Sequence, residues 1–145
     1  MRPIPSLIGA LYRAIVKPIC FRFDPEDVHD AITALGVFMG RFALVRQVMR
    51  WALTYQDPRL SQMIAGVPFL NPVGLSAGFD KNVKLISLLP SIGFGAAEFG
   101  SITLKPYGGN PKPRLVRLPK SKGIIVNYGL MNDGAEAIIP RLRAH

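Results

Sequence analysis

Apolar residues in the first third of the chain recur at the spacing of helices. One such stripe runs from Leu7 to Ile15 with Arg13 on another face, and Pro18 is expected to end that helix or to lie just beyond its end. Another helix is predicted over Ala43–Leu53, where apolar residues again follow helical spacing beside basic ones. These patterns predict helices that are apolar on one side and basic on the other.

The clearest helix start in the chain lies between these two segments. Asp24 suits an N-cap, Pro25 the first helical position, and the acidic Glu26 and Asp27 the positive end of a helix. An apolar stripe follows as far as residue 39. We therefore predict a small helical domain over residues 1–62. Its apolar faces either pack on the rest of the protein or enter a membrane interface beside anionic lipid.

From about residue 63 the pattern changes to short apolar runs between Gly and Pro. We expect a small hairpin over 66–73, a strand over 73–77, a helix over 83–89 closed by Pro90, and a strand over 95–103. Strand, helix and strand in this order predict the parallel pairing of an α/β protein. Leu115–Leu118 and Gly123–Val126 are predicted as two strands paired outside that sheet, and 133–144 as a helix capped by Asn132 or Asp133.

Composition narrows the functional classes. The chain has 145 residues, 18 Lys+Arg against 9 Asp+Glu, a net charge of +9 and one cysteine. A disulfide framework is excluded, and two histidines with one distant thiol do not make a zinc site. The basic residues are spread over both predicted domains, so a nucleic-acid partner is not expected, and no segment is predicted to span a membrane. A non-catalytic basic module that associates with membranes stays an alternative.

Residues 71–82, NPVGLSAGFDKN, carry the most specific chemistry. A buried strand ends in Ala77 and Gly78 and immediately presents Asp80 and Lys81. Small residues at a strand end let a flat ring approach the backbone, and an amine there can meet an anion. A solvated turn after a strand is the simpler alternative from residue types alone.

Together with GFGAAEFGSIT and GGNPKPRLVRLP, this motif resembles the N-terminal part of the membrane-associated, quinone-linked dihydroorotate dehydrogenases. The resemblance implies the first units of an FMN-binding (β/α)₈ TIM barrel over 63–145, preceded by the helical domain. It also implies oxidation of dihydroorotate to orotate in pyrimidine synthesis, with a membrane quinone as acceptor. The protein would lie peripherally on a membrane, either the cytoplasmic side of a bacterial inner membrane or the mitochondrial inner membrane.

The resemblance assigns site residues by position. The flavin lip comprises Ala77, Gly78, Phe79, Asp80 and Lys81, with Ser101 at the end of the second strand. Lys81 would touch the substrate as well, and His29 and Arg117 would line the quinone tunnel. No metal ligands are implied.

One segment departs from the family pattern Ile-Asn-Arg-x-Gly-Phe-Asn-Asn. The corresponding substrate loop includes Val126, Asn127, Tyr128, Gly129 and Leu130. Val126 replaces the Asn expected to bind the pyrimidine, which makes a related FMN and quinone oxidoreductase with another substrate the alternative.

The chain is also too short for a complete barrel, which needs about 250 residues. The family's proton-abstracting Ser is expected beyond residue 145, so no catalytic residue is assigned within the chain. We expect an N-terminal fragment, with activity belonging to the full-length protein rather than to this chain alone.

Overall fold

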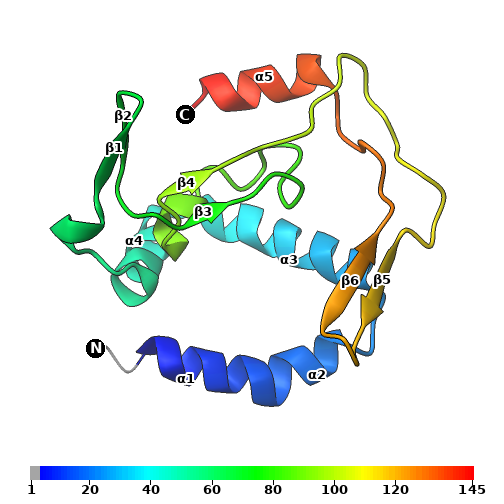
Figure 1. Ribbon diagram of the computed structural model, residues 1–145, viewed down its shortest axis with the longest axis horizontal. Helices are drawn as coiled ribbons and strands as arrows, with labels where there is room; N and C mark the ends of the chain where they lie inside the picture. The colour runs from blue at the N-terminus through cyan, green and yellow to red at the C-terminus, as the bar shows by residue number, and fades with distance from the viewer. Residues whose placement is uncertain (1–3) are drawn as a thin grey trace.

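The computed structural model describes residues 4–145 and shows a mixed α/β chain whose helical part comes first (Figure 1). Its first helical run continues through α1 (Ile4–Leu11), a π-helical segment (Tyr12–Val16) and α2 (Lys17–Cys20). The prediction that Pro18 ends this helix or lies just beyond it is wrong, because the helical run passes through Pro18 to Cys20. The Lys17 N–H bonds to the Tyr12 carbonyl five residues earlier, so the backbone widens just before the proline, which has no N–H to donate.

The next two helices follow the sequence signals. Helix α3 is Pro25–Gly40, and the Asp24 side chain accepts the Glu26 N–H at 2.8 Å, which confirms the predicted cap. Helix α4 is Ala43–Leu53, as predicted. In residues 4–145 no single helix is long and apolar enough to cross a membrane; α3 and α4 together have the length and composition, but they bend by 111°.

The strands are short and form three separate pairs. A hairpin is present but begins earlier than the predicted 66–73: β1 (Gln62–Ile64) runs antiparallel to β2 (Val67–Phe69), and only β2 lies within the predicted range. The predicted parallel pair shrinks to β3 (Gly74–Leu75) and β4 (Ala96–Ala97). Strands β5 (Leu115–Leu118) and β6 (Gly123–Val126) form an antiparallel pair of their own, as predicted.

The predicted helix over 83–89 is wrong. This stretch forms turns, and a 3-10 segment begins only at Leu89–Ile92. The reason lies in two local features: the Asp80 carboxylate accepts the N–H groups of Lys84 and Leu85, and Val83 has a φ of +57°. Pro90 stands in the first turn of the 3-10 segment instead of closing a helix.

The last helix, α5 (Ala135–Arg143), begins later than predicted, with Gly134 at its N-cap. Neither predicted residue caps it. The Asn132 side chain instead accepts the Gly134 N–H at 2.8 Å, one position before the helix.

The core lies where α3 and α4 meet the turn-rich segment. It is centred on Leu85, Leu88 and Leu89. Gly36 on α3 permits this contact, because a Cβ there would lie 2.7 Å from Cδ2 of Leu85. Many apolar side chains of the helices stay exposed, among them Leu44 at 72% and Trp51 at 60%.

In Figure 1, α1 and α2 form one rod below α3, and the β5–β6 pair stands at the end where α2 leads into α3. A contact agrees with this placement: Arg117 of β5 donates to the Phe23 carbonyl in that connection at 2.7 Å.

Candidate functional site

An open cavity of about 1710 Å³ lies between α3, the ends of β3 and β4, and the segment around β5 and β6. Every residue that the sequence predicts for the flavin lip, the substrate loop and the quinone tunnel lines it. These residues are Ala77, Gly78, Phe79, Asp80, Lys81, Ser101, Val126, Asn127, Tyr128, Gly129, Leu130, His29 and Arg117. The fold thus brings together segments as far apart in sequence as residues 29 and 130.

The predicted flavin lip is held by backbone bonds between the two parallel strands' ends. The Gly78 N–H donates to the Gly100 carbonyl at 3.0 Å, so the chain just before Ser101 lies beside the chain just after Ala77. Gly78 has a φ of +104°, a conformation that favours glycine. No heavy atom lies within 4 Å of the place where its Cβ would stand, so the backbone there faces open space.

Asp80 belongs to this lip, but its carboxylate accepts hydrogen bonds from the protein backbone. The side chain is 2% exposed, and its two oxygens accept the backbone N–H groups of Lys84 at 2.9 Å and Leu85 at 2.7 Å. Asp80 therefore fixes the turn that follows Lys81.

His29 joins α3 to the same lip. Its Nε2 lies 2.9 Å from the Phe79 carbonyl oxygen, its Nδ1 lies 3.2 Å from Asp30, and its ring meets the Phe79 ring edge-on at 5.0 Å. The Nε2 contact to a carbonyl oxygen places the proton on Nε2. The predicted quinone-side and flavin-side residues are thus in direct contact.

Lys81 and Tyr128 form the polar centre of the cavity wall. The Lys81 ammonium lies 4.2 Å from the centroid of the Tyr128 ring, and the Arg114 guanidinium lies 4.7 Å from the same centroid. Burial lowers the pKa of Lys81, and the nearby Arg114 lowers it further, whereas Glu26 raises it. Burial raises the pKa of Tyr128 to about 12, so its hydroxyl stays protonated at neutral pH.

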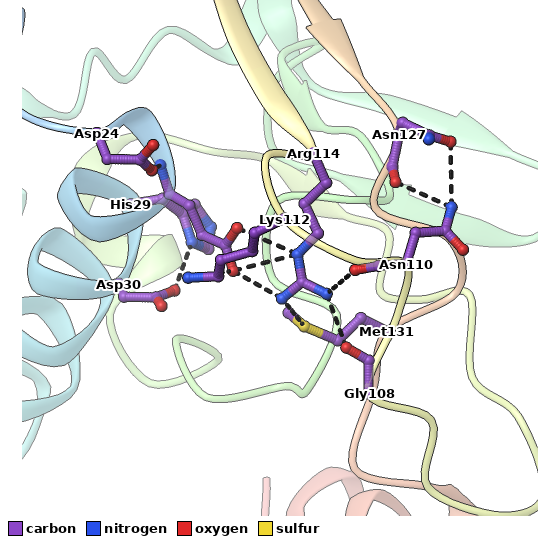
Figure 2. Close-up of polar contacts among 10 residues, drawn as sticks. Asp24, His29, Asp30, Gly108, Asn110, Lys112, Arg114, Asn127 and Met131 are labelled. Atoms are coloured by element: carbon purple, nitrogen blue, oxygen red, sulfur yellow. Dashed lines mark hydrogen bonds and ion pairs between the residues drawn. The ribbon is translucent and has the colours of Figure 1, made fainter.

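Arg114, which lies over the Tyr128 ring, forms a buried ion pair with Glu26, and Figure 2 draws the contacts around Arg114. The Arg114 Nη2 lies 2.6 Å from Glu26 Oε1, with side chains 8% and 3% exposed. Lys112, which is 59% exposed, reaches the same oxygen at 3.2 Å. The hydrogen bond from Arg114 holds the pKa of Glu26 below its ordinary value. The sequence analysis missed this pair, because its members lie 88 residues apart. Glu26 also suits the first turn of a helix, and Arg114 suits a basic loop.

The substrate loop is only partly polar. The Asn110 amide nitrogen donates to the Asn127 carbonyl at 2.9 Å and to its side-chain oxygen at 3.1 Å. Val126 is 58% exposed and Leu130 52%, both apolar, and Gly129 has a φ of +70°. Two side chains of the loop can form hydrogen bonds: Asn127, which Asn110 engages, and Tyr128, whose hydroxyl is buried.

Arg117 lines the cavity near the connection between α2 and α3. Besides its bond to the Phe23 carbonyl, its guanidinium lies 4.8 Å from the centroid of the Phe21 ring. It links β5 to the connection between α2 and α3.

Comparison with known proteins agrees with this geometry. A family model described as dihydroorotate dehydrogenase matches residues 59–145. A Christiangramia forsetii protein named dihydroorotate dehydrogenase (quinone) is 38% identical over 138 residues, 93% of this chain and 40% of its own length. A Gloeobacter violaceus protein of the same name is 43% identical over 135 residues, covering 91% of this chain and 37% of that protein.

A solved structure is similar as well. The crystal structure of Eimeria tenella DHODH in complex with ferulenol superposes with a TM-score of 0.68 at 40% identity, over 83% of this chain and 30% of that one. The chain thus spans well under half the length of the relatives it matches. The resemblance seen in the sequence motifs is confirmed: this chain belongs to the dihydroorotate dehydrogenase family.

Proposed function

We propose that the full-length protein oxidises dihydroorotate to orotate and passes the electrons through FMN to a membrane quinone, as a step of pyrimidine synthesis. One observation carries the proposal: the predicted flavin, substrate and quinone residues, drawn from separate segments, line one cavity. The names of the relatives support the substrate and the acceptor. In this proposal residues 63–145 supply the first units of a (β/α)₈ barrel, and residues 1–62 form the helical domain.

The lip residues fit a flavin. Open space beside the Gly78 backbone leaves room for a flat ring, and Lys81 supplies a cation close by. Bound FMN would accept a hydride from the substrate. Around it, Ala77, Gly78 and Phe79 would contact the ring, while the Ser101 hydroxyl, on an exposed residue, would donate a hydrogen bond. The Lys81 ammonium would stabilise negative charge on the substrate carboxylate and on the reduced ring.

The helical side fits an apolar electron acceptor. His29 and Arg117 line the cavity at α3 and β5, beside exposed apolar residues of the helices such as Phe38 and Ile32. We propose that a quinone enters here from a membrane on which the helices lie peripherally. That membrane is a bacterial inner membrane, at its cytoplasmic face, or the mitochondrial inner membrane.

Val126 favours a second candidate. Its apolar side chain faces the cavity where a polar contact to the pyrimidine is expected, and a site that lacks a polar contact discriminates differently among substrates. A related FMN and quinone oxidoreductase acting on another substrate is the function this residue supports.

Replacement of Lys81 tests the proposal. In the full-length protein, we expect Lys81→Ala to remove a charge-assisted contact to the substrate, which costs on the order of 2–4 kcal/mol, or roughly a thousandfold in the rate of flavin reduction by dihydroorotate. Anaerobic stopped-flow absorbance measures that rate. Lys84→Ala is the matched control, because Lys84 is exposed three residues away. If both variants slowed flavin reduction equally little, residues 77–81 would not be the flavin lip. Rapid reduction by a different substrate, with none by dihydroorotate, would favour the second candidate.

A further inference from the structure

Arg114 uses every hydrogen-bond donor that its side chain has. Its Nε donates to the Glu26 carboxylate, and its Nη2 to Glu26 Oε1 and, at 3.0 Å, to the Met131 sulfur. Its Nη1 donates to the carbonyls of Gly108 at 2.7 Å and Asn110 at 3.0 Å (Figure 2). A guanidinium has five N–H groups, so none is left for a ligand. Arg114 therefore holds other parts of the protein in place.

The part that Arg114 holds includes the Tyr128 ring. Tyr128 is 8% exposed, and Arg114 and Lys81 both lie over its ring. The backbone packs tightly around this contact: a Cβ at Gly109 would lie 2.5 Å from Arg114 Nη1 and 2.5 Å from the Tyr128 carbonyl oxygen. A shift of Arg114 therefore moves Tyr128, and with it the surface against which the Lys81 ammonium rests.

We propose that Glu26 is a positioning residue for the cavity: it anchors Arg114, and Arg114 fixes Tyr128 against the Lys81 ammonium. Glu26 lies in the first turn of α3, so the seating of the helical domain sets the place of the amine at the strand end. This inference rests on the proposed function, in which Lys81 faces the substrate. Glu26 itself touches neither substrate nor flavin in this proposal and acts only through Arg114 and Tyr128.

The charged groups around Lys81 connect it to Glu26 and Arg114 as well. Among residues 4–145, the ionised groups that act on the pKa of Lys81 are Arg114, which lowers it, and Glu26, which raises it; the Tyr128 ring lies against the amine. Loss of the Glu26 charge therefore lowers the pKa of Lys81. Loss of the anchor also frees the Tyr128 ring to shift, which opens a path for a reagent to the amine. Both effects increase the reactivity of the Lys81 amine at neutral pH.

Competitive labelling of lysines tests the proposal. Full-length protein, wild type and Glu26→Gln, is treated with trace acetic anhydride across a pH series, and mass spectrometry gives the labelling rate of Lys81 relative to exposed Lys84 and Lys122. We expect the Lys81 rate near neutral pH to rise about threefold or more, and its pH profile to move to lower pH. A purely structural role would expose the amine to water, and because burial lowers the pKa of Lys81, its profile would then move to higher pH.

Lys112→Ala is the matched control, since it removes the exposed partner of the same carboxylate and leaves Arg114 paired; we expect an unchanged Lys81 profile. If Glu26→Gln does not fold, Glu26→Asp, which keeps the charge but shortens the reach, should raise the Lys81 rate by a smaller factor. An unchanged Lys81 rate and profile in a folded Glu26 variant overturns the proposal. A shifted profile in a protein that does not oxidise dihydroorotate refutes the proposed function alone.

Discussion

Asp80 offers the sharpest test of how the strand-end lip is built. Its 2% exposed carboxylate accepts the N–H groups of Lys84 and Leu85, in place of the bonds a helix would make there. Asp80→Ala deletes both acceptors without adding bulk. We expect the turn after Lys81 to loosen and the whole protein to lose stability.

The size of the loss follows from the burial of the two donors. A hydrogen bond to a charged group contributes about 1.5–3 kcal/mol. The Leu85 N–H is buried and would stay unpaired, which costs the upper part of that range, whereas the N–H of exposed Lys84 can turn to water. The free energy of unfolding should therefore fall by about 3–4 kcal/mol. Asp80→Asn keeps one acceptor oxygen and should lose about half as much.

Urea unfolding of the full-length protein measures these losses, and hydrogen exchange at the Lys84 and Leu85 amides reports the local opening. Asp27→Ala is the control, because Asp27 is exposed in the first turn of α3 and its loss should cost less than about 0.5 kcal/mol. If Asp80→Ala unfolded within about 1 kcal/mol of wild type, with both amides still protected, the structural role of this carboxylate would be refuted.

Three further predictions concern the helical part and its contacts. Gly36→Ala should destabilise the full-length protein by about 1–2 kcal/mol in thermal or urea unfolding, because the new Cβ meets buried Leu85. Gly9→Ala is the control and should not destabilise the protein, because its new Cβ meets only the flexible end of the Arg13 side chain. Residues 1–53 should direct binding to anionic vesicles, and the amount of protein that co-sediments should fall as salt rises but leave a hydrophobic remainder. The double variant Arg13→Glu with Arg50→Glu should weaken vesicle binding by about 1 kcal/mol per charge. No binding at low salt would contradict the membrane assignment. The lowered pKa of Glu26 contributes stability that is complete above its ordinary value of 4.5 and is lost as pH falls through the folded value, so Glu26→Gln should flatten this acid limb of stability against pH.

The sequence predicted elements that short-range signals determine. Asp24 and Pro25 start α3 because a cap and a fixed φ act within a few residues, and the β5–β6 pair follows from two apolar runs around a short turn. Errors arose where a side chain competes with regular backbone bonding. Asp80 captures two N–H groups that the predicted helix needs, and a π-helical segment carries the first helix past Pro18.

Site residues that lie within sequence motifs could be assigned before the structure was known. Residues that only the fold brings together were missed. The lip and loop residues lie within continuous motifs, so the resemblance could assign them, and in the structure they line one cavity. The Glu26–Arg114 pair could not be found this way, since Glu26 is equally suited to a helix start and Arg114 to a basic loop. Likewise, the role of Tyr128 depends on two cations that come to its ring from separate segments.

The long separation between Glu26 and Arg114 has a consequence for biosynthesis. Ribosomes add about 5–20 residues per second, and the two partners are 88 residues apart, so the helices wait about 4–18 s after emerging before their anchor exists. During that interval the carboxylate of α3 has no Arg114 to pair with, although the core residues Leu85, Leu88 and Leu89 are made before its end. The nascent helices are then free to meet a lipid surface or a chaperone first, and the later α/β segment of the chain would pack onto helices that are already placed.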